Sequence, residues 1–315
     1  MSRVAAIDCG TNSVRLLIAD LGPAGLTDVH REMRVVRLGE GVDRTGRLAP
    51  QALERTRLAL VDYAELIRQN GVEKIRMVAT SASRDAENAE EFHAMVRDTL
   101  GIDPEVITGL AEASLSFTGA VAGLPGAEST RAESVLTGPL LVADIGGGST
   151  ELVLGSASQG TVLAAHSMDV GCVRMTERHL HTDPPLPSEI EATLLDLRTA
   201  LQAAAVDVPV RDAAGFVGVA GTVTTLAAVA LELPAYDSVA IHASMLSYQQ
   251  VEQVTGRLLS MSRDERAALP VIHPGRVDVI AGGALVLRTV MEFVGADRVL
   301  VSEHDILDGI ALSLR

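Results

Sequence analysis

The chain of 315 residues is long enough for two domains of ordinary size, and a hydrophobic content of 47% supports a full core in each. Aromatic residues make up only 2%, so these cores are aliphatic. The formal net charge of −15 argues against non-specific binding to nucleic acid, and it requires that local arginines and metal ions attract any polyanionic substrate.

Two cysteines and one uncharged segment bear on the location of the protein. Cys9 and Cys172 are far apart and form no Cys-x-x-Cys motif, which is typical of buried thiols in a reducing cytosol. The apolar run between Arg3 and Asp8 is too short for a signal peptide. Residues 213–231 carry no charge, but their glycines and threonines favour a buried strand, a Gly-Thr turn and a helix over a membrane span. We expect a cytoplasmic protein without a membrane partner.

The first part of the sequence predicts strands and helices in alternation. The expected strands cover residues 4–7, 14–19, 29–36 and 75–79, and the expected helices cover 50–70 and 110–122. Residues 123–138 contain glycine, proline, serine and glutamate without periodicity. We therefore expect a linker there, and with it the boundary between two domains.

The second part of the sequence predicts a similar alternation. The expected elements are a hairpin at 140–154, a strand at 162–168, helices from 171, at 188–204 and at 246–261, a short helix capped by Ser262, a long apolar segment at 276–293, a strand at 299–302 and a last helix ending near 314. Gly282 and Gly283 interrupt the long apolar segment, and each weakens a helix by about 1 kcal/mol relative to alanine. They indicate close approach of a ligand or of a neighbouring helix.

One pattern occurs twice, and it organises the chain. The sequence Asp-x-Gly-x-x-Ser, followed after two residues by three apolar residues, begins at Asp8 and again at Asp144. Each copy joins two apolar runs, which predicts a hairpin whose glycine-rich turn presents N–H groups to an anion, most often phosphate. The repeat indicates two lobes built on one plan. Its one informative mismatch aligns Arg15 with Glu151.

The two turns supply most of the candidate site residues. In the second turn, Asp144 precedes the glycines and Glu151 follows them, so that two carboxylates flank an anion site, as in a Mg²⁺–phosphate site. The candidate phosphate-binding residues are Gly10, Thr11, Asn12 and Ser13 in the first turn, and Gly146, Gly147, Gly148, Ser149 and Thr150 in the second.

Two further candidates stand at the beginnings of predicted helices. Arg84 lies where the positive end of the helix dipole disfavours a cation, so we weigh contact with phosphate equally against a salt bridge with Asp85 or Glu87. Glu112 lies in the first turn of the next helix, where an acidic residue usually just complements the dipole. The eight histidines form no convincing metal set, and no serine hydrolase, zinc protease or P-loop motif is present.

Several motifs together resemble a known family. They are Asp8-Cys-Gly-Thr-Asn-Ser13, Arg37-Leu-Gly-Glu-Gly41, Thr80-Ser-Ala-x-Arg84-x-Ala-x-Asn88, Ile107-x-Gly-x-x-Glu112-Ala, Asp144-Ile-Gly-Gly-Gly-Ser-Thr-Glu151, Gly171-x-Val-Arg174, Gly221-Thr222 and Pro274-x-Arg276-x-Asp278. Over nearly the whole chain they resemble the exopolyphosphatase / guanosine pentaphosphate phosphatase family of the actin-like ATPase superfamily. Members usually carry two adjacent glutamates where this chain has Ala111-Glu112. The chain is similar to the short members, which lack C-terminal helical domains.

The resemblance implies an α/β fold with two actin-like (ribonuclease H-like) lobes around a central cleft. We expect residues 1–123 to form the N-terminal lobe, with the first phosphate loop, and residues 124–315 to form the C-terminal lobe, with the second. The last helix is a candidate to pack back on the first lobe. A homodimer is also implied.

The implied activity is hydrolysis of the terminal phosphoanhydride of inorganic polyphosphate, with release of orthophosphate. Glu112, at the position that the family assigns to catalysis, would accept the proton of the attacking water, and Glu151 is a second catalytic candidate. Mg²⁺ or Mn²⁺ held by Asp144 and Glu151 would bridge phosphoryl oxygens. Arg84 would hold the penultimate phosphates.

Other functions remain open for the same residues. A phosphatase that converts guanosine pentaphosphate to guanosine tetraphosphate is the nearest alternative, because the terminal phosphoryl group is alike in both substrates. An ATP-dependent kinase is less favoured because Glu112 is placed for a water rather than for an acceptor hydroxyl. An inactive polyphosphate or alarmone sensor is less favoured because Glu112, Asp144 and Glu151 are retained. The expected partner is therefore inorganic polyphosphate or a phosphorylated guanosine nucleotide, without nucleic acid.

Overall fold

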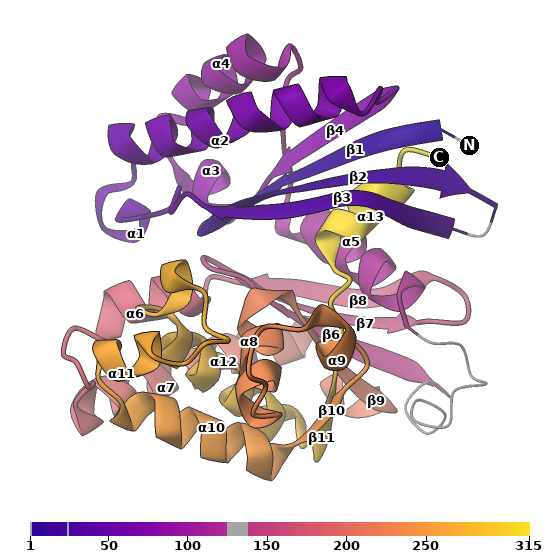
Figure 1. The fold of residues 1–315 in the computed structure, drawn as a ribbon. Coiled ribbons are helices and arrows are strands. Elements are labelled where there is room, and N and C mark those ends of the chain that lie inside the picture. The colour runs from indigo at the N-terminus through magenta and orange to yellow at the C-terminus, as the bar shows by residue number, and fades with distance from the viewer. Residues whose placement is uncertain (1, 24, 125–137) are drawn as a thin grey trace. The chain divides into compact units, whose positions relative to one another are not determined.

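The chain forms two compact units, each built on one mixed β-sheet with helices packed against it (Figure 1). The computed structural model describes residues 2–23, 25–124 and 138–315. Most of the predicted linker at 123–138 therefore lies outside the described residues. The first unit contains Met1–Gly119 and Asp305–Arg315, and the second contains Ala120–His304.

The sheet of the first unit has five strands in the order β3-β2-β1-β4-β5. They are β1 (Ser2–Cys9), β2 (Ser13–Gly22), β3 (Gly25–Val35), β4 (Lys74–Ala79) and β5 (Glu105–Val106). The first three strands pair antiparallel, whereas β4 lies parallel to β1 and β5 parallel to β4. Side chains alternate across a strand, so Ala6 and Ile7 face opposite sides of the sheet, and both are fully buried. Burial on both faces explains why β1 is an uninterrupted apolar run.

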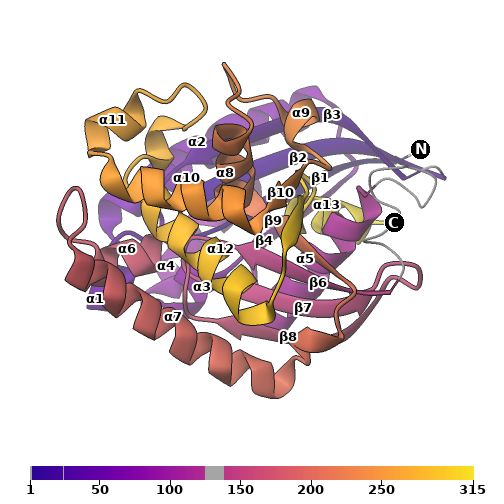
Figure 2. The same cartoon turned by 90° about the horizontal axis from the view of Figure 1, so that it is seen from below.

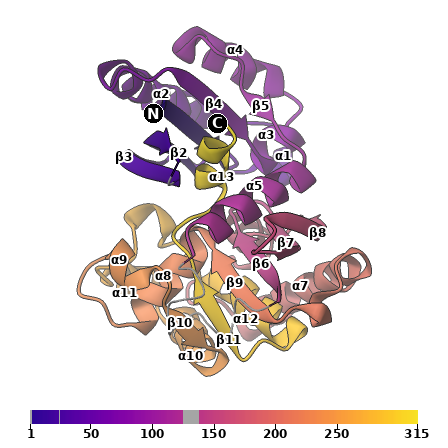
Figure 3. The same ribbon diagram turned by 90° about the vertical axis from the view of Figure 1, so that its right-hand side faces the viewer.

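Helices cover both faces of this sheet. They are α1 (Val42–Thr45), α2 (Pro50–Gln69), α3 (Ser81–Asp85), α4 (Ala89–Leu100), α5 (Gly109–Ala122) and α13 (Ile306–Leu312). Tyr63 of α2 and Phe92 of α4 share a core with Ile7 on one face. Ile310 of α13 shares a core with Ala6 on the other face, and Figure 3 shows α13 beside this sheet. The last helix of the chain thus completes the first unit.

The sheet of the second unit has six strands in the order β10-β11-β9-β6-β7-β8. They are β6 (Pro139–Ile145), β7 (Thr150–Ser156), β8 (Thr161–Met168), β9 (Gly215–Val219), β10 (Met245–Ser247) and β11 (Arg298–Val301). Read from β8 to β11, the order and the strand directions repeat those of the first sheet, and β10 is an added antiparallel edge. The repeat predicted from the two turns therefore extends to whole sheets, and the predicted α/β fold with two ribonuclease H-like units is confirmed.

The helices of the second unit surround an aliphatic core. They are α6 (Cys172–His179), α7 (Pro187–Asp207), α8 (Ala220–Ala230), α9 (Ser238–Ile241), α10 (Tyr248–Ser260), α11 (Arg263–Ala267) and α12 (Ile280–Val294), with short 3₁₀ turns at Val210–Asp212 and Pro274–Arg276. Leu201 of α7, Leu258 of α10 and Leu285 of α12 meet in this core. Figure 2 shows these three helices next to one another. Within the described ranges, no helix combines the length and apolar character that a membrane crossing needs.

Two predicted elements differ from the structure. The Gly-Thr turn expected after β9 is the first turn of α8, because Ala220 adopts a left-handed φ of 69° and reverses the chain at a single residue. The long apolar segment at 276–293 is divided, since the 3₁₀ turn Pro274–Arg276 precedes α12, which begins only at Ile280.

The two glycines of α12 have a packing role. A Cβ atom at Gly282 would lie 2.5 Å from Thr176 Oγ1 of α6, and one at Gly283 would lie 2.5 Å from Thr222 Cγ2 of α8. The close approach predicted from these glycines is therefore an approach of neighbouring helices. It joins α12 to α6, which follows β8, and to α8, which follows β9.

Candidate active site

The candidate residues of the first unit follow the C-terminal ends of parallel strands. Asp8 on β1 pairs with Val78 on β4, and Ala79 on β4 pairs with Val106 on β5. The segments after these strands meet at one edge of the sheet, which is where open α/β sheets bind ligands. They carry Gly10, Thr11, Asn12, Ser13, Arg84 and Glu112.

The second unit repeats this placement. Asp144 on β6 pairs with Val219 on the parallel strand β9, so the segments after both strands share one edge. This edge brings together the second group of predicted residues, Asp144, Gly146, Gly147, Gly148, Ser149, Thr150 and Glu151.

Both glycine-rich turns close through the same hydrogen bond. The Gly10 N–H donates to the Ser13 carbonyl at 2.9 Å, and the Gly146 N–H donates to the Ser149 carbonyl at 3.1 Å. The equivalence inferred from the sequence thus holds at the backbone. Thr150 Oγ1, beside the second turn, is buried and has no hydrogen-bond partner within the described part of the chain.

The loop after β3 supports the first turn. The Gly39 N–H donates to the Thr11 carbonyl at 2.8 Å, and Thr11 Oγ1 shares a 2.8 Å hydrogen bond with Ser81 Oγ at the beginning of α3. A Cβ atom at Gly39 would lie 2.3 Å from Thr11 Cγ2, so only glycine fits there. Arg37 in the same loop has a left-handed φ of 50°. The glycine motif at residues 37–41 therefore holds the turn in place.

Arg15 neutralises the first turn. It faces Asp8 directly across β1 and β2, and its Nη2 lies 2.6 Å from Asp8 Oδ2. The same guanidinium also forms an ion pair with Asp305. Burial raises the pKa of Asp8, and the charge of Arg15 partly offsets this effect. The other carboxylate oxygen, Asp8 Oδ1, is buried without a hydrogen-bond partner among the described residues.

Arg84 forms an ion pair that the sequence did not predict. Its Nη1 donates to Glu112 Oε2 at 3.2 Å and to the Ile107 carbonyl at 3.0 Å, whereas the contact with Asp85 is only 4.0 Å. Glu112 is 8% exposed, in the first turn of α5. The ion pair fixes the position of the Glu112 carboxylate beside Arg84.

The N-terminal end of α6 supports the second turn. The Cys172 N–H donates to the Gly146 carbonyl at 3.0 Å, and the Val173 N–H donates to the Gly147 carbonyl at 2.9 Å. Arg174 Nε donates to the Gly148 carbonyl at 2.7 Å. Arg174 lies in the first turn of α6, where the helix dipole disfavours a cation. The sequence predicts the same placement for Arg84, but the structure places Arg84 in the last turn of the five-residue helix α3.

Asp144 and Glu151 fit a divalent cation. They face each other directly across β6 and β7 and are 5% and 1% exposed. Ser167 on β8 donates to Glu151 Oε1 at 2.7 Å and orients it. Carboxylate oxygens are ligands that Mg²⁺ prefers, and this pair places two carboxylates side by side on neighbouring strands. Among the described residues no three His, Cys, Asp or Glu side chains form a metal cluster, whereas Mg²⁺ commonly uses one or two carboxylates together with substrate phosphates.

Arg276, in the segment before α12, also reaches this edge of the second sheet. Arg276 Nη1 donates to the Gly221 carbonyl at 3.1 Å and to Thr225 Oγ1 at 3.2 Å, both in the first two turns of α8. A Cβ atom at Gly221 would lie 2.0 Å from Arg276 Nη2, so the glycine makes room for the guanidinium. The left-handed Ala220 precedes this contact, and strained backbone of this kind clusters at functional sites.

The family model described as the Ppx/GppA phosphatase family matches residues 17–314. The chain belongs to this family. The chain is 52% identical to "Exopolyphosphatase 2" of Mycobacterium tuberculosis, with 100% of this chain and 99% of that protein aligned.

Solved structures of the family agree with the fold. An exopolyphosphatase-like protein is similar with a TM-score of 0.93 and 42% identity, covering 99% of this chain and 98% of that one. The Ppx/GppA protein of Aquifex aeolicus is similar with a TM-score of 0.79 and 32% identity, covering 99% and 97%. Both groups of candidate residues thus lie on a fold that members of this phosphatase family share.

Proposed function

We propose that the protein is an exopolyphosphatase, which hydrolyses the terminal phosphoanhydride of inorganic polyphosphate and releases orthophosphate. The observation that supports this best is the pair Asp144 and Glu151 beside the second glycine turn, two buried carboxylates where the first turn has an aspartate facing an arginine. The full-length similarity to "Exopolyphosphatase 2" supports the same substrate.

The glycine turns bind and orient phosphate. Their N–H groups, together with the side chains of the two turns, donate to phosphoryl oxygens where negative charge accumulates in the transition state. Arg84 adds positive charge for the penultimate phosphates and holds Glu112 in place through the 3.2 Å ion pair. Glu112 accepts the proton of the attacking water.

Asp144 and Glu151 are the residues that would hold Mg²⁺ or Mn²⁺. When bound, such an ion neutralises the charge of the phosphoryl oxygens. Ser167 keeps Glu151 oriented toward that position. Phosphate release that survived exhaustive chelation would contradict this assignment.

The Glu112→Gln substitution tests the general base. We expect kcat to fall about 10²- to 10⁴-fold, because glutamine cannot accept a proton, while KM changes little. The matched control is Glu90→Gln, since Glu90 is an exposed glutamate in the first turn of α4 in the same unit. Full phosphate release by Glu112→Gln would rule out the assignment of Glu112.

A panel of substrates separates the competing functions. Purified protein with Mg²⁺ is offered short polyphosphate, long polyphosphate, guanosine pentaphosphate and ATP, and free phosphate is measured for each. We expect release from polyphosphate; release from guanosine pentaphosphate alone would identify the nucleotide phosphatase instead. Release from none would indicate a sensor, and transfer from ATP to an acceptor would indicate a kinase.

Light scattering tests the homodimer, and cell fractionation tests the cytoplasmic location.

A further inference from the structure

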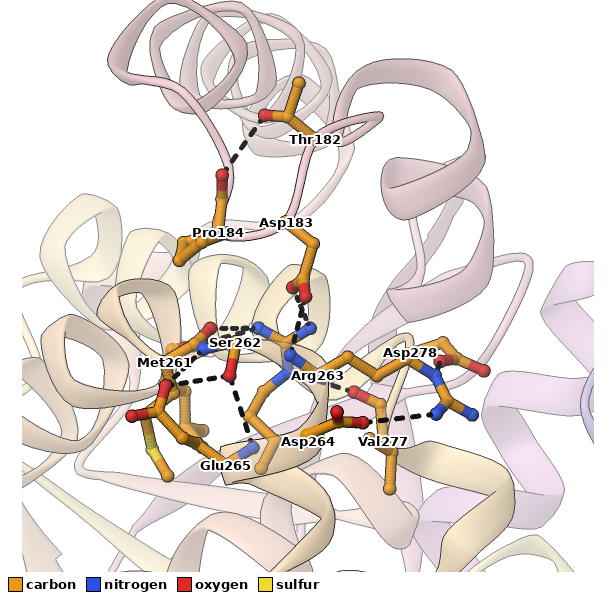
Figure 4. Close-up of polar contacts among 12 residues, drawn as sticks. Thr182, Asp183, Pro184, Met261, Ser262, Arg263, Asp264, Glu265, Val277 and Asp278 are labelled. Atoms are coloured by element: carbon orange, nitrogen blue, oxygen red, sulfur yellow. Dashed lines mark hydrogen bonds and ion pairs between the residues drawn. The ribbon is translucent and has the colours of Figure 1, made fainter.

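Arg276 is followed directly by two residues, Val277 and Asp278, that are each held by a separate arginine. The Val277 carbonyl accepts a hydrogen bond from Arg266 Nε at 3.1 Å, and Asp278 Oδ1 accepts one from Arg263 Nε at 2.6 Å. Both arginines belong to the five-residue helix α11. Figure 4 shows Arg263 reaching Asp278 beside Val277. The backbone that carries Arg276 is therefore fixed from α11.

Asp183 in turn fixes α11. Its Oδ2 accepts from the Arg263 N–H at 2.6 Å, and Figure 4 shows Asp183 beside Arg263. Its Oδ1 accepts from Arg266 Nη2 at 2.7 Å. Asp183 lies in the loop before α7, so the contact joins distant parts of the second unit. Two carboxylate oxygens thus hold both the backbone and a side chain of the helix.

Arg266 is the buried centre of this arrangement. It is 4% exposed, and besides Asp183 and Val277 it donates to the Met261 carbonyl at 2.7 Å. A planar guanidinium with donors in several fixed directions sets the relative positions of its acceptors. It therefore fixes the junction of α10 and α11 relative to Val277, the residue next to Arg276.

We propose that Asp183, Arg263, Arg266 and Asp278, here called the α11 clamp, are positioning residues for Arg276 in the reaction. The clamp holds the Arg276 guanidinium over the first turn of α8, one strand away from the glycine turn after β6. There Arg276 binds internal phosphates of the polyphosphate chain, beyond the terminal phosphoryl group. This inference rests on the proposed function.

The clamp acts on binding more than on chemistry. The guanidinium of Arg276 contacts Gly221 and Thr225, and it is neither the candidate base, Glu112, nor part of the carboxylate pair Asp144 and Glu151. Loosening the clamp lets the guanidinium leave the Gly221 turn, which lowers affinity for the chain but leaves the reacting groups in place. A residue that only supports folding would lower stability and the amount of active protein instead.

A double-mutant cycle tests this coupling. We expect Asp278→Asn to raise KM for polyphosphate about 3- to 30-fold with kcat within about twofold, and Arg276→Ala to raise KM as well. In the Arg276→Ala background, Asp278→Asn should add less than about twofold, because no guanidinium is left to position. Arg263→Ala, which truncates a side chain that is 56% exposed and so spares the core, should reproduce the effect of Asp278→Asn.

KM and kcat are also measured for a control variant, Asp20→Asn. Asp20→Asn breaks the Arg3–Asp20 pair of the first unit, which has 2.8 and 2.9 Å contacts, and should leave KM unchanged. Equal rises in KM with and without Arg276, no effect of Arg276→Ala on KM, or a fall in kcat alone would each overturn the proposal. Failure of the proposed function would appear separately, as absence of phosphate release by the wild-type protein.

Discussion

The same strand position carries opposite charges in the two units. Arg15 faces Asp8 in the first hairpin, whereas Glu151 faces Asp144 in the second. In the first hairpin the guanidinium neutralises the carboxylate within the protein. In the second hairpin, two carboxylates share the position. Under the proposed function, this one difference between two copies of a motif gives the second hairpin the carboxylate pair that would hold the metal ion.

Replacing Arg15 with methionine should destabilise the first unit. The change leaves Asp8 and Asp305 buried without their shared partner, and breaking a buried pair in this way costs about 3–5 kcal/mol. The pKa of Asp8 is already raised by burial, and it should rise further. A protonated Asp8 does not need the guanidinium, so the deficit should be largest at neutral pH and should shrink as the pH falls through that raised pKa.

Urea denaturation of Arg15→Met and of the wild type at several pH values measures this effect. The control is Arg3→Met, which removes a pair with side chains that are 36% and 28% exposed and should cost at most about 1 kcal/mol. A deficit of the Arg15 variant that stayed constant or grew on acidification would show that the charge of Asp8 is not its origin.

Helix α12 shows how packing can reverse an intrinsic preference. A helical glycine replaced by alanine gains about 1 kcal/mol where space is free. At Gly283 the new Cβ atom would meet Thr222 at 2.5 Å and Cys172 Cβ at 3.0 Å, and overpacking of this kind costs about 1–3 kcal/mol. We therefore expect Gly283→Ala to lower the free energy of unfolding.

The chain contains a matched control for this change. Gly256 lies inside α10, and a Cβ atom there would meet nothing within 4 Å. Gly256→Ala should raise the free energy of unfolding by up to about 1 kcal/mol. Thermal or chemical denaturation of both variants checks the opposite signs; a stabilising Gly283→Ala would show that α6 and α8 can move away from α12.

Most elements followed from local patterns. The glycine turns at Asp8 and Asp144 were predictable because turn chemistry and apolar runs are neighbours in sequence. The Arg84–Glu112 ion pair was not, because it depends on β4 and β5 lying next to each other. The contact of Arg276 with Gly221 was not predictable either, since only the folded chain brings residues 55 positions apart together.

The chain leaves the first unit and returns to it at its end. Residues after Gly119 build the second unit, and α13 then packs on the sheet formed by the first residues of the chain. Gly119 and Gly309 permit this return, because a Cβ atom at Gly119 would lie 1.8 Å from the Asp305 carbonyl and one at Gly309 would lie 2.0 Å from the Leu115 carbonyl. The first unit therefore folds completely only when both ends of the chain are present.

Ile310→Ala tests this dependence. Ile310 is fully buried with Val4 and Leu17, so its truncation should cost about 2–5 kcal/mol. Because each unit has its own core, hydrogen exchange followed by mass spectrometry should show lost protection in β1 and β2 but not in β6 and β9. The control Leu58→Ala, on α2 with 52% exposure, should change stability by no more than about 0.5 kcal/mol. Equal loss of protection in both sheets would mean that the two cores open together, and that the return of α13 stabilises the whole chain rather than the first unit alone.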